Sequence, residues 1–147
     1  MTAEHGPLVV ERHIAATPPA VYAYLTDSER WARWQGAEAT IEAVPGGLFR
    51  ILMGNGMCAR GQFVELVPHK RVVFTWGWID LPDLPPGSTV VEIDLEQDGE
   101  GTLIRLTHRD MPADHVDMHR VGWEHYLTRL GVCAAGGDPG PDPGAGA

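Results

Sequence analysis

The sequence predicts an α+β domain in which a seven-stranded antiparallel sheet curls around one long C-terminal helix. Residues 39–109 form a series of short runs rich in Val, Ile, Phe and Trp, each bounded by glycine, proline or charged turn residues. Connections this short join antiparallel neighbours, because a parallel pair needs a longer crossover. Residues 114–134 instead show a helical period, which places an amphipathic helix at the end of the domain.

The N-terminal part contributes one strand and two short helices. Residues 8–14 alternate apolar and polar side chains, as a half-buried strand does. Thr17 is a suitable helix cap, and Pro18 and Pro19 after it fit a first helical turn. Ser28 begins a second short helix, which carries Trp34.

Six further strands complete the predicted sheet. They are expected at residues 39–44, 48–53, 57–67, 71–78, 89–97 and 102–109. The long connection at residues 80–88 and the Gly- and Pro-containing turns between the other runs separate them.

The last helix is the clearest element of the sequence. Its apolar stripe consists of Val116, Trp123, Leu127, Leu130 and Ala134. Its polar residues can remain in solvent on the other faces, namely Asp114, Asp117, Glu124 and Arg129. Gly136 and Gly137 end the helix, and the Gly-, Pro- and Asp-rich residues after it lack the apolar surface to offset their ordering entropy. We therefore expect a domain at residues 8–135, an N-terminal extension at 1–7 and a disordered tail at 136–147.

Composition narrows the possible partners. The chain has 147 residues and a net charge of -9, and it shows no basic patch, which disfavours nucleic-acid binding. We expect no membrane insertion, since no apolar run is long enough to span a bilayer and the start does not read as a signal peptide. Cys58 and Cys133 are expected to be free thiols, so a cytoplasmic location is predicted.

Several phrases in the same order resemble a known family. They are Thr17-Pro18-Pro19-Ala20-Val21-Tyr22, Leu25-Thr26-Asp27 to Trp34, Gly61-Gln62-Phe63-Val64-Glu65 with Pro68, Val73-Phe74-Thr75-Trp76, Gly101-Thr102-Leu103, Leu106-Thr107-His108 and Gly122-Trp123. Together with the order of elements, they resemble the homologues of the Hsp 90 ATPase activator, within the START-like or SRPBCC superfamily. The resemblance covers about residues 8–134.

This resemblance implies the helix-grip fold, also called Bet v-like. In that superfamily an elongated cavity between sheet and last helix serves lipids, sterols, plant hormones, polyketides or aromatic substrates in different members. The eukaryotic activator resembles this chain only in its C-terminal domain, so the resemblance alone implies no co-chaperone activity. A particular activity does not follow from the fold.

Large side chains are the first candidates for a cavity wall. Phe74, Trp76 and Trp78 share one strand face by the period of two, and they either line a pocket or fill the core. The same two alternatives hold for Trp34 and Trp123. The full set of candidate ligand-binding residues is Trp34, Phe49, Arg50, Phe74, Trp76, Trp78, His108, Trp123 and Leu127.

Two polar candidates carry specific chemistry. An inward Arg50 would bind a carboxylate, whereas an outward Arg50 would lie in solvent. His108 shares its strand face with Leu106, where it would act as an acid or base or be hydrogen-bonded within the core. His115 and His119 are one helical turn apart, but Val116 stands where an H-E-x-x-H motif needs glutamate, so no metal is predicted. The glycines at 46–47 and 54–56 read as hairpin turns and form no P-loop or dinucleotide pattern, so no cofactor is predicted.

Three functions remain open. The first is a binding protein for a small hydrophobic or amphipathic ligand, favoured over an enzyme because Ser28 and Ser88 lie outside a nucleophile motif and the single lysine, Lys70, lies in a turn. The second is a cyclase- or hydratase-like enzyme in which His108 moves a proton. The third is a chaperone- or stress-associated interaction protein. A homodimer is compatible with each of them.

Overall fold

The computed structural model describes residues 7–142. Its elements, in chain order, are β1 (Leu8–Ile14), α1 (Pro18–Ala23), α2 (Ser28–Trp34), β2 (Glu38–Ile41), β3 (Leu48–Leu52), β4 (Cys58–Val67), β5 (Arg71–Trp76), β6 (Thr89–Asp98), β7 (Gly101–Arg109) and α3 (Ala113–Ala134). The predicted fold class is therefore confirmed, with the expected elements in the expected order.

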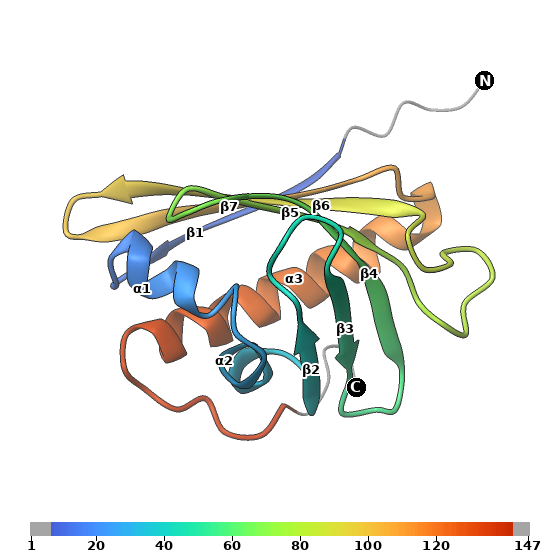
Figure 1. Ribbon diagram of the computed structural model, residues 1–147, viewed down its shortest axis with the longest axis horizontal. Coiled ribbons are helices and arrows are strands. Elements are labelled where there is room, and N and C mark those ends of the chain that lie inside the picture. Colours follow the sequence, from blue (N-terminus) through green and yellow to red (C-terminus); the bar gives the residue numbers. More distant parts are fainter. Residues whose placement is uncertain (1–6, 143–147) are drawn as a thin grey trace.

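All seven strands belong to one antiparallel sheet. Their spatial order is β1-β7-β6-β5-β4-β3-β2, so β1 and β2 form the two opposite edges of the sheet. Only the β1–β7 pairing joins distant parts of the sequence, and each other strand pairs with its neighbour in the chain. Figure 1 shows this sheet curving over α3, with α1 and α2 on the same side of the sheet as α3.

The helices begin where the sequence predicts. The Thr17 hydroxyl caps α1 by accepting from the backbone N–H of Ala20, at 3.4 Å. The Asp27 carboxylate caps α2 by accepting from the backbone N–H of Arg30, at 3.0 Å. Both caps satisfy backbone donors that a first helical turn leaves without a partner. The caps at Thr17 and Asp27 thereby fix the residues at which α1 and α2 begin.

The core lies between the concave face of the sheet and α3. Alternate residues of β6 and β7 point into it, as in the burial of Ile93 and Leu106, and Leu127 and Leu130 of α3 meet them from the other side. No helix within residues 7–142 combines the length and the apolar character that crossing a membrane requires.

Two strands end before their predicted positions: β2 ends at Ile41, where a strand was expected over residues 39–44, and β5 also ends early. The sequence pattern placed residues 71–78 in one strand, but β5 ends at Trp76. At Gly77 the carbonyl oxygen of Pro85 lies where a side chain would begin, 1.8 Å from an ideal Cβ position. Only glycine admits this close approach of the 79–88 loop. Trp78 rejoins the sheet through a single bridge to Ala59.

The prediction that Arg129 stays in solvent is wrong. Its side chain is 7% exposed and donates to the carbonyls of Trp34 at 3.0 Å and Gly140 at 2.7 Å. Weaker hydrogen bonds reach the carbonyls of Pro139 and Pro141. Arg129 thus joins α2 to the segment that follows α3.

Residues 136–142 make contacts that their composition does not predict. This stretch runs as coil past α2 (Figure 1), and the Asp142 carboxylate accepts from the backbone N–H of Gly36 at 2.7 Å. Composition predicts the lack of regular secondary structure but not the carbonyl contacts with Arg129. The remainder of the predicted tail, 143–147, and most of the predicted N-terminal extension lie outside the described residues.

Candidate functional site

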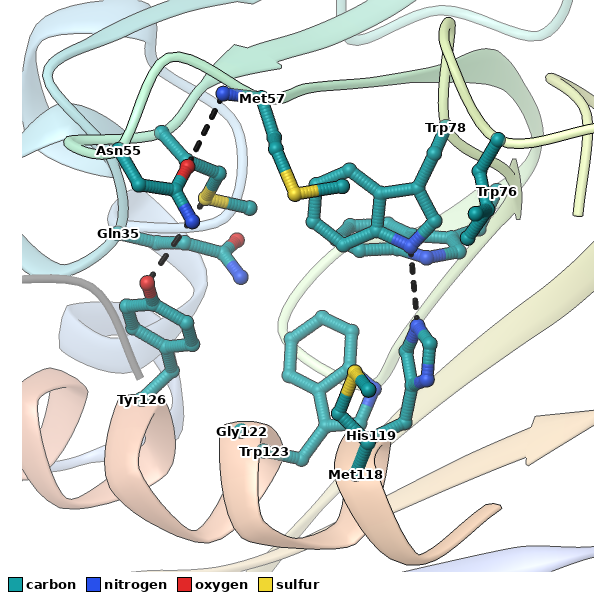
Figure 2. A pocket seen from close by; sticks show the side chains of 12 residues that line it. Gln35, Asn55, Met57, Trp76, Trp78, Met118, His119, Gly122, Trp123 and Tyr126 are labelled. Atoms are coloured by element: carbon teal, nitrogen blue, oxygen red, sulfur yellow. Dashed lines mark hydrogen bonds between the residues drawn. The ribbon is translucent and has the colours of Figure 1, made fainter. Parts of the chain in front are cut away.

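A small pocket opens between the sheet and α3. Its volume is about 120 Å³. Its wall consists of Gln35, Met53, Asn55, Met57, Trp76, Trp78, Leu81, Met118, His119, Gly122, Trp123 and Tyr126. Figure 2 shows the side chains from the sheet and its loops on one side and those from α3 on the other. The pocket thus lies between the sheet and the last helix, where the helix-grip resemblance predicts a cavity.

Three tryptophans form the largest part of the wall. The ring centroids of Trp76 and Trp123 are 5.1 Å apart, and those of Trp76 and Trp78 are 5.3 Å apart in an edge-to-face arrangement. Trp76 and Trp123 are almost completely buried, whereas Trp78 is half-buried at the rim. The two alternatives expected for these rings therefore both apply, because the rings pack against one another and also line the pocket.

The rim of the pocket is apolar and exposed. Met118 of α3 is 69% exposed and Met57, just before β4, is 39% exposed. Methionine side chains are flexible and polarizable, so they adapt to molecules of different shape. The sharp turn at Gly77 brings Trp78 and Leu81 to the same rim, and the backbone N–H of Trp78 donates to the Leu84 carbonyl at 2.7 Å.

Gln35 lies at the inner end of the pocket, where α2 meets β2. The chain turns at Gly36, which has a φ of +82° and whose ideal Cβ would lie 2.6 Å from Ile51 Cγ2 and 2.7 Å from the Leu52 carbonyl oxygen. Both the backbone conformation and the space require glycine. The turn fixes the direction of the Gln35 side chain, which is 1% exposed.

His119 is the titratable group of the pocket wall with a perturbed pKa. Burial lowers the pKa of His119 from its ordinary value, so the imidazole is neutral at neutral pH. Its Nδ1–H donates to the His115 carbonyl at 2.8 Å, and its Nε2 accepts from Trp78 Nε1 at 3.1 Å. Both ring nitrogens therefore have partners, which leaves neither for a metal ion.

His108 points inward but is not part of the pocket wall. Its Nδ1 accepts from Trp123 Nε1 at 3.0 Å, and because an indole N–H only donates, the proton must sit on Nε2. Nε2 then donates to the Thr89 hydroxyl at 2.8 Å, which donates to the Trp76 carbonyl at 2.8 Å. Burial, with a smaller contribution from His119, lowers the pKa of His108 to about 3. The buried and hydrogen-bonded alternative therefore describes this residue.

The other predicted site residues lie away from the pocket. Phe49 and Phe74 stack with centroids 4.2 Å apart, and Trp34 packs on Trp31 at 4.7 Å. These side chains and Leu127 are fully buried in the core. They share the concave side with the pocket but lie deeper than its wall.

Arg50 takes the outward alternative. It is partly exposed and lies on the strand face opposite to buried Phe49, with Thr40 and Arg60 as its cross-strand neighbours. The structure thus does not bring Arg50 to the pocket, where it would have met an anionic ligand.

Sequence reasoning missed most of the wall. The missed residues are Gln35, Met53, Asn55, Met57, Leu81, Met118, His119, Gly122 and Tyr126. For His119 and Tyr126 a signal existed, since they lie four residues before and three after Trp123 and so on the same face of α3. For Asn55 and Leu81 there was none, because loop residues carry no periodic pattern.

Comparison with known proteins agrees with the predicted resemblance. The family model for Activator of Hsp90 ATPase homolog 1-like protein matches residues 15–135. The human activator of 90 kDa heat shock protein ATPase homolog 1 is 29% identical over 119 residues, which are 81% of this chain and 34% of the human protein. The chain thus spans about a third of the length of the curated relatives that it matches.

Solved structures show the same fold. An AHSA1-like protein from Rhizobium etli is 44% identical with a TM-score of 0.68, covering 99% of this chain and 93% of that one. The Aha1 dimer from Colwellia psychrerythraea is 19% identical with a TM-score of 0.79, covering 90% and 98%. On the match to the family model and to the Rhizobium protein, this chain belongs to the Activator of Hsp90 ATPase homolog 1-like family.

Proposed function

We propose that this protein binds a small hydrophobic or amphipathic molecule, about the size of one aromatic ring, between the sheet and α3. The observation that carries the proposal is the pocket itself, which is partly open and walled mainly by aromatic rings and methionines. Ligand sites are typically concave and mostly apolar, with a few polar groups that fix orientation.

The volume limits the ligand. An engineered cavity of about 150 Å³ with a comparable apolar wall holds benzene, whereas drug-sized molecules occupy about 300–1,000 Å³. A pocket of about 120 Å³ therefore accommodates one ring with a small substituent. The lipids and sterols that the superfamily resemblance allows would first require Met57, Trp78 and Met118 to move apart.

A panel of single-ring compounds tests the proposal by thermal unfolding and native mass spectrometry. A ligand at ten times its Kd stabilises the folded state by about 1.4 kcal/mol, which raises the Tm of a domain of this size by about 3–6 °C. If no compound in the panel raises the Tm, the proposal is wrong.

Two glycines of α3 provide a matched pair of variants. Gly122 lines the pocket, so Gly122→Leu fills it with a side chain while favouring helix formation. Gly131→Ala also favours the helix, and its added Cβ meets only Ile14 Cγ1 at an ordinary 3.7 Å. We expect Gly122→Leu to abolish the ligand-induced rise in Tm and Gly131→Ala to retain it.

The cyclase- or hydratase-like alternative depends on His108 as the residue that moves a proton. A general base needs access to the substrate and a pKa near the working pH. His108 does not line the pocket, and its Nδ1 is occupied by the N–H of Trp123, which does line it. Burial also lowers the pKa of His108 to about 3. The structure therefore favours binding over a cyclase-like reaction that His108 would drive.

A chaperone-associated role is the second candidate, because the similarity to the human activator covers 119 residues. Such a role would use the outer surface of the domain. Measuring the ATPase rate of a purified Hsp90-type chaperone with and without this protein tests it, and an unchanged rate would speak against it.

Two further expectations accompany the binding proposal. A cytoplasmic location is supported by the two free, buried thiols, Cys58 and Cys133. A homodimer is supported by the similarity in fold to the Colwellia dimer. Light scattering of the purified protein measures the oligomeric state directly.

A further inference from the structure

The orientation of the Gln35 amide is determined by its neighbour. Its Oε1 accepts a hydrogen bond from Trp31 Nε1 at 2.9 Å. An indole nitrogen only donates, so the amide must turn its oxygen toward Trp31 and its NH2 group away from it. Figure 2 shows the end of the Gln35 side chain directed into the space between Trp76 and Tyr126. Within residues 7–142, no group accepts a hydrogen bond from Gln35 Nε2.

Two more wall residues present donors without partners. Asn55 Oδ1 accepts from the backbone N–H of Met57 at 3.0 Å, so its NH2 group is the free end of the amide at the rim. Trp76 Nε1 also has no hydrogen-bond partner in the described part of the chain, but it is fully buried, so a ligand would reach it only after the Trp76 ring moves. A buried donor without a partner destabilises the protein unless a bound molecule accepts from it.

The wall carries no formal charge. Its residues include no aspartate, glutamate, lysine or arginine, and His119 is held neutral by burial. The His119 Nε2 lone pair is already occupied by Trp78 Nε1. A charged ligand would lose its hydration without meeting an opposite charge, which disfavours it strongly. The pocket is therefore neutral, and its free hydrogen-bond donors are the NH2 groups of Gln35 and Asn55.

We propose that the ligand is a neutral single-ring aromatic compound bearing a carbonyl-type acceptor, whose oxygen accepts from Gln35 Nε2. This inference rests on the proposed binding function and specifies its ligand class. The ring packs against the pocket-facing sides of Trp76 and Trp123, where offset and edge-to-face contacts are favourable. The acceptor then pairs with the NH2 group of Gln35 that faces the pocket, for which an apolar or donor-only ring offers no acceptor.

Three compounds of similar size test the ligand class by isothermal titration calorimetry. Acetophenone carries a neutral acceptor, ethylbenzene has the same shape without the oxygen, and benzoate adds a charge. We expect acetophenone to bind about tenfold more tightly than ethylbenzene, and benzoate most weakly of the three. Equal affinities for acetophenone and ethylbenzene would overturn the ligand class alone. Absence of binding by all three would overturn the binding function as well.

Variants of the amide and of its neighbour assign the effect to Gln35. Gln35→Met keeps the length of the side chain and removes the donor, so the preference for acetophenone should disappear while ethylbenzene still binds. The double variant Trp31→Phe/Gln35→Met removes the same donor without leaving the Trp31 N–H unpaired. Ethylbenzene binding in each variant shows that the pocket persists. A tenfold preference that survives both substitutions would refute the role of Gln35.

Discussion

Protonation of His108 should make the folded state labile to acid. The folded protein holds the pKa of His108 near 3, whereas the unfolded chain has the ordinary value of 6.5. Between these values the unfolded state binds the additional proton, so stability is full above pH 6.5 and falls as the pH falls. From pH 7 to pH 5 this group alone lowers the free energy of unfolding by about 2 kcal/mol. The figure depends on the unfolded pKa and changes little if the folded pKa lies anywhere below 4.

Urea unfolding of wild-type protein and His108→Gln at pH 7 and pH 5 measures this contribution. Glutamine can accept from Trp123 Nε1 and donate to the Thr89 hydroxyl, but it does not titrate. The wild type should lose about 2 kcal/mol more than the variant over this pH range. Thr89→Val is the control, because it weakens the fold at both pH values and leaves a buried histidine in place. Equal losses in wild type and His108→Gln would refute the reasoning.

Three further predictions concern stability, each measured by urea unfolding at pH 7. Gly36→Ala should cost about 1–3 kcal/mol, because the new Cβ meets Ile51 at 2.6 Å and the φ is positive; a cost below 0.5 kcal/mol would contradict the close approach. Arg129→Ala should cost about 2–3 kcal/mol and speed amide exchange in residues 136–142, whereas unchanged exchange would show that Arg129 does not hold that segment. Phe49→Ala should cost about 3–5 kcal/mol, since Phe49 is fully buried against Phe74, and Arg50→Ala on the opposite face of β3 should cost little.

The fold follows from local patterns in the sequence. Apolar alternation, glycine and proline turns and one long helical stripe predict seven antiparallel strands around a terminal helix, and the structure confirms them. The end of β5 at Trp76 could not be predicted, because it depends on the close approach of the Pro85 carbonyl to Gly77. Pro85 lies in a loop, and a strand pattern does not reveal which loop residue will contact the strand. The burial of Arg129 could not be predicted, because its helix face is covered by α2 and by the segment after α3. That segment has no periodic pattern that would reveal the contact.

The pocket could be predicted only in part. Alternation along a strand tells which face a side chain takes, so Trp76 and Trp78 were assigned to the concave side and indeed line the pocket. It does not tell how far along the curved sheet the open space lies, and Phe49 and Phe74 on the same side are packed into the core. Gln35 was missed because its role depends on a hydrogen bond to Trp31 that only the assembled core reveals.

Indole groups remove the ambiguity of three side chains around the pocket. An amide can flip and a neutral imidazole can carry its proton on either nitrogen. Trp31, Trp78 and Trp123 each donate to one such group, namely Gln35, His119 and His108. For the proposed ligand, the Gln35 amide orientation and the His119 tautomer are therefore selected before binding, and no affinity would be lost to populating a minor state. Exchanging Trp31, which does not line the pocket, for phenylalanine would preserve an apolar ring and leave the Gln35 amide free to flip, so a residue outside the pocket wall would change the polar pattern inside it.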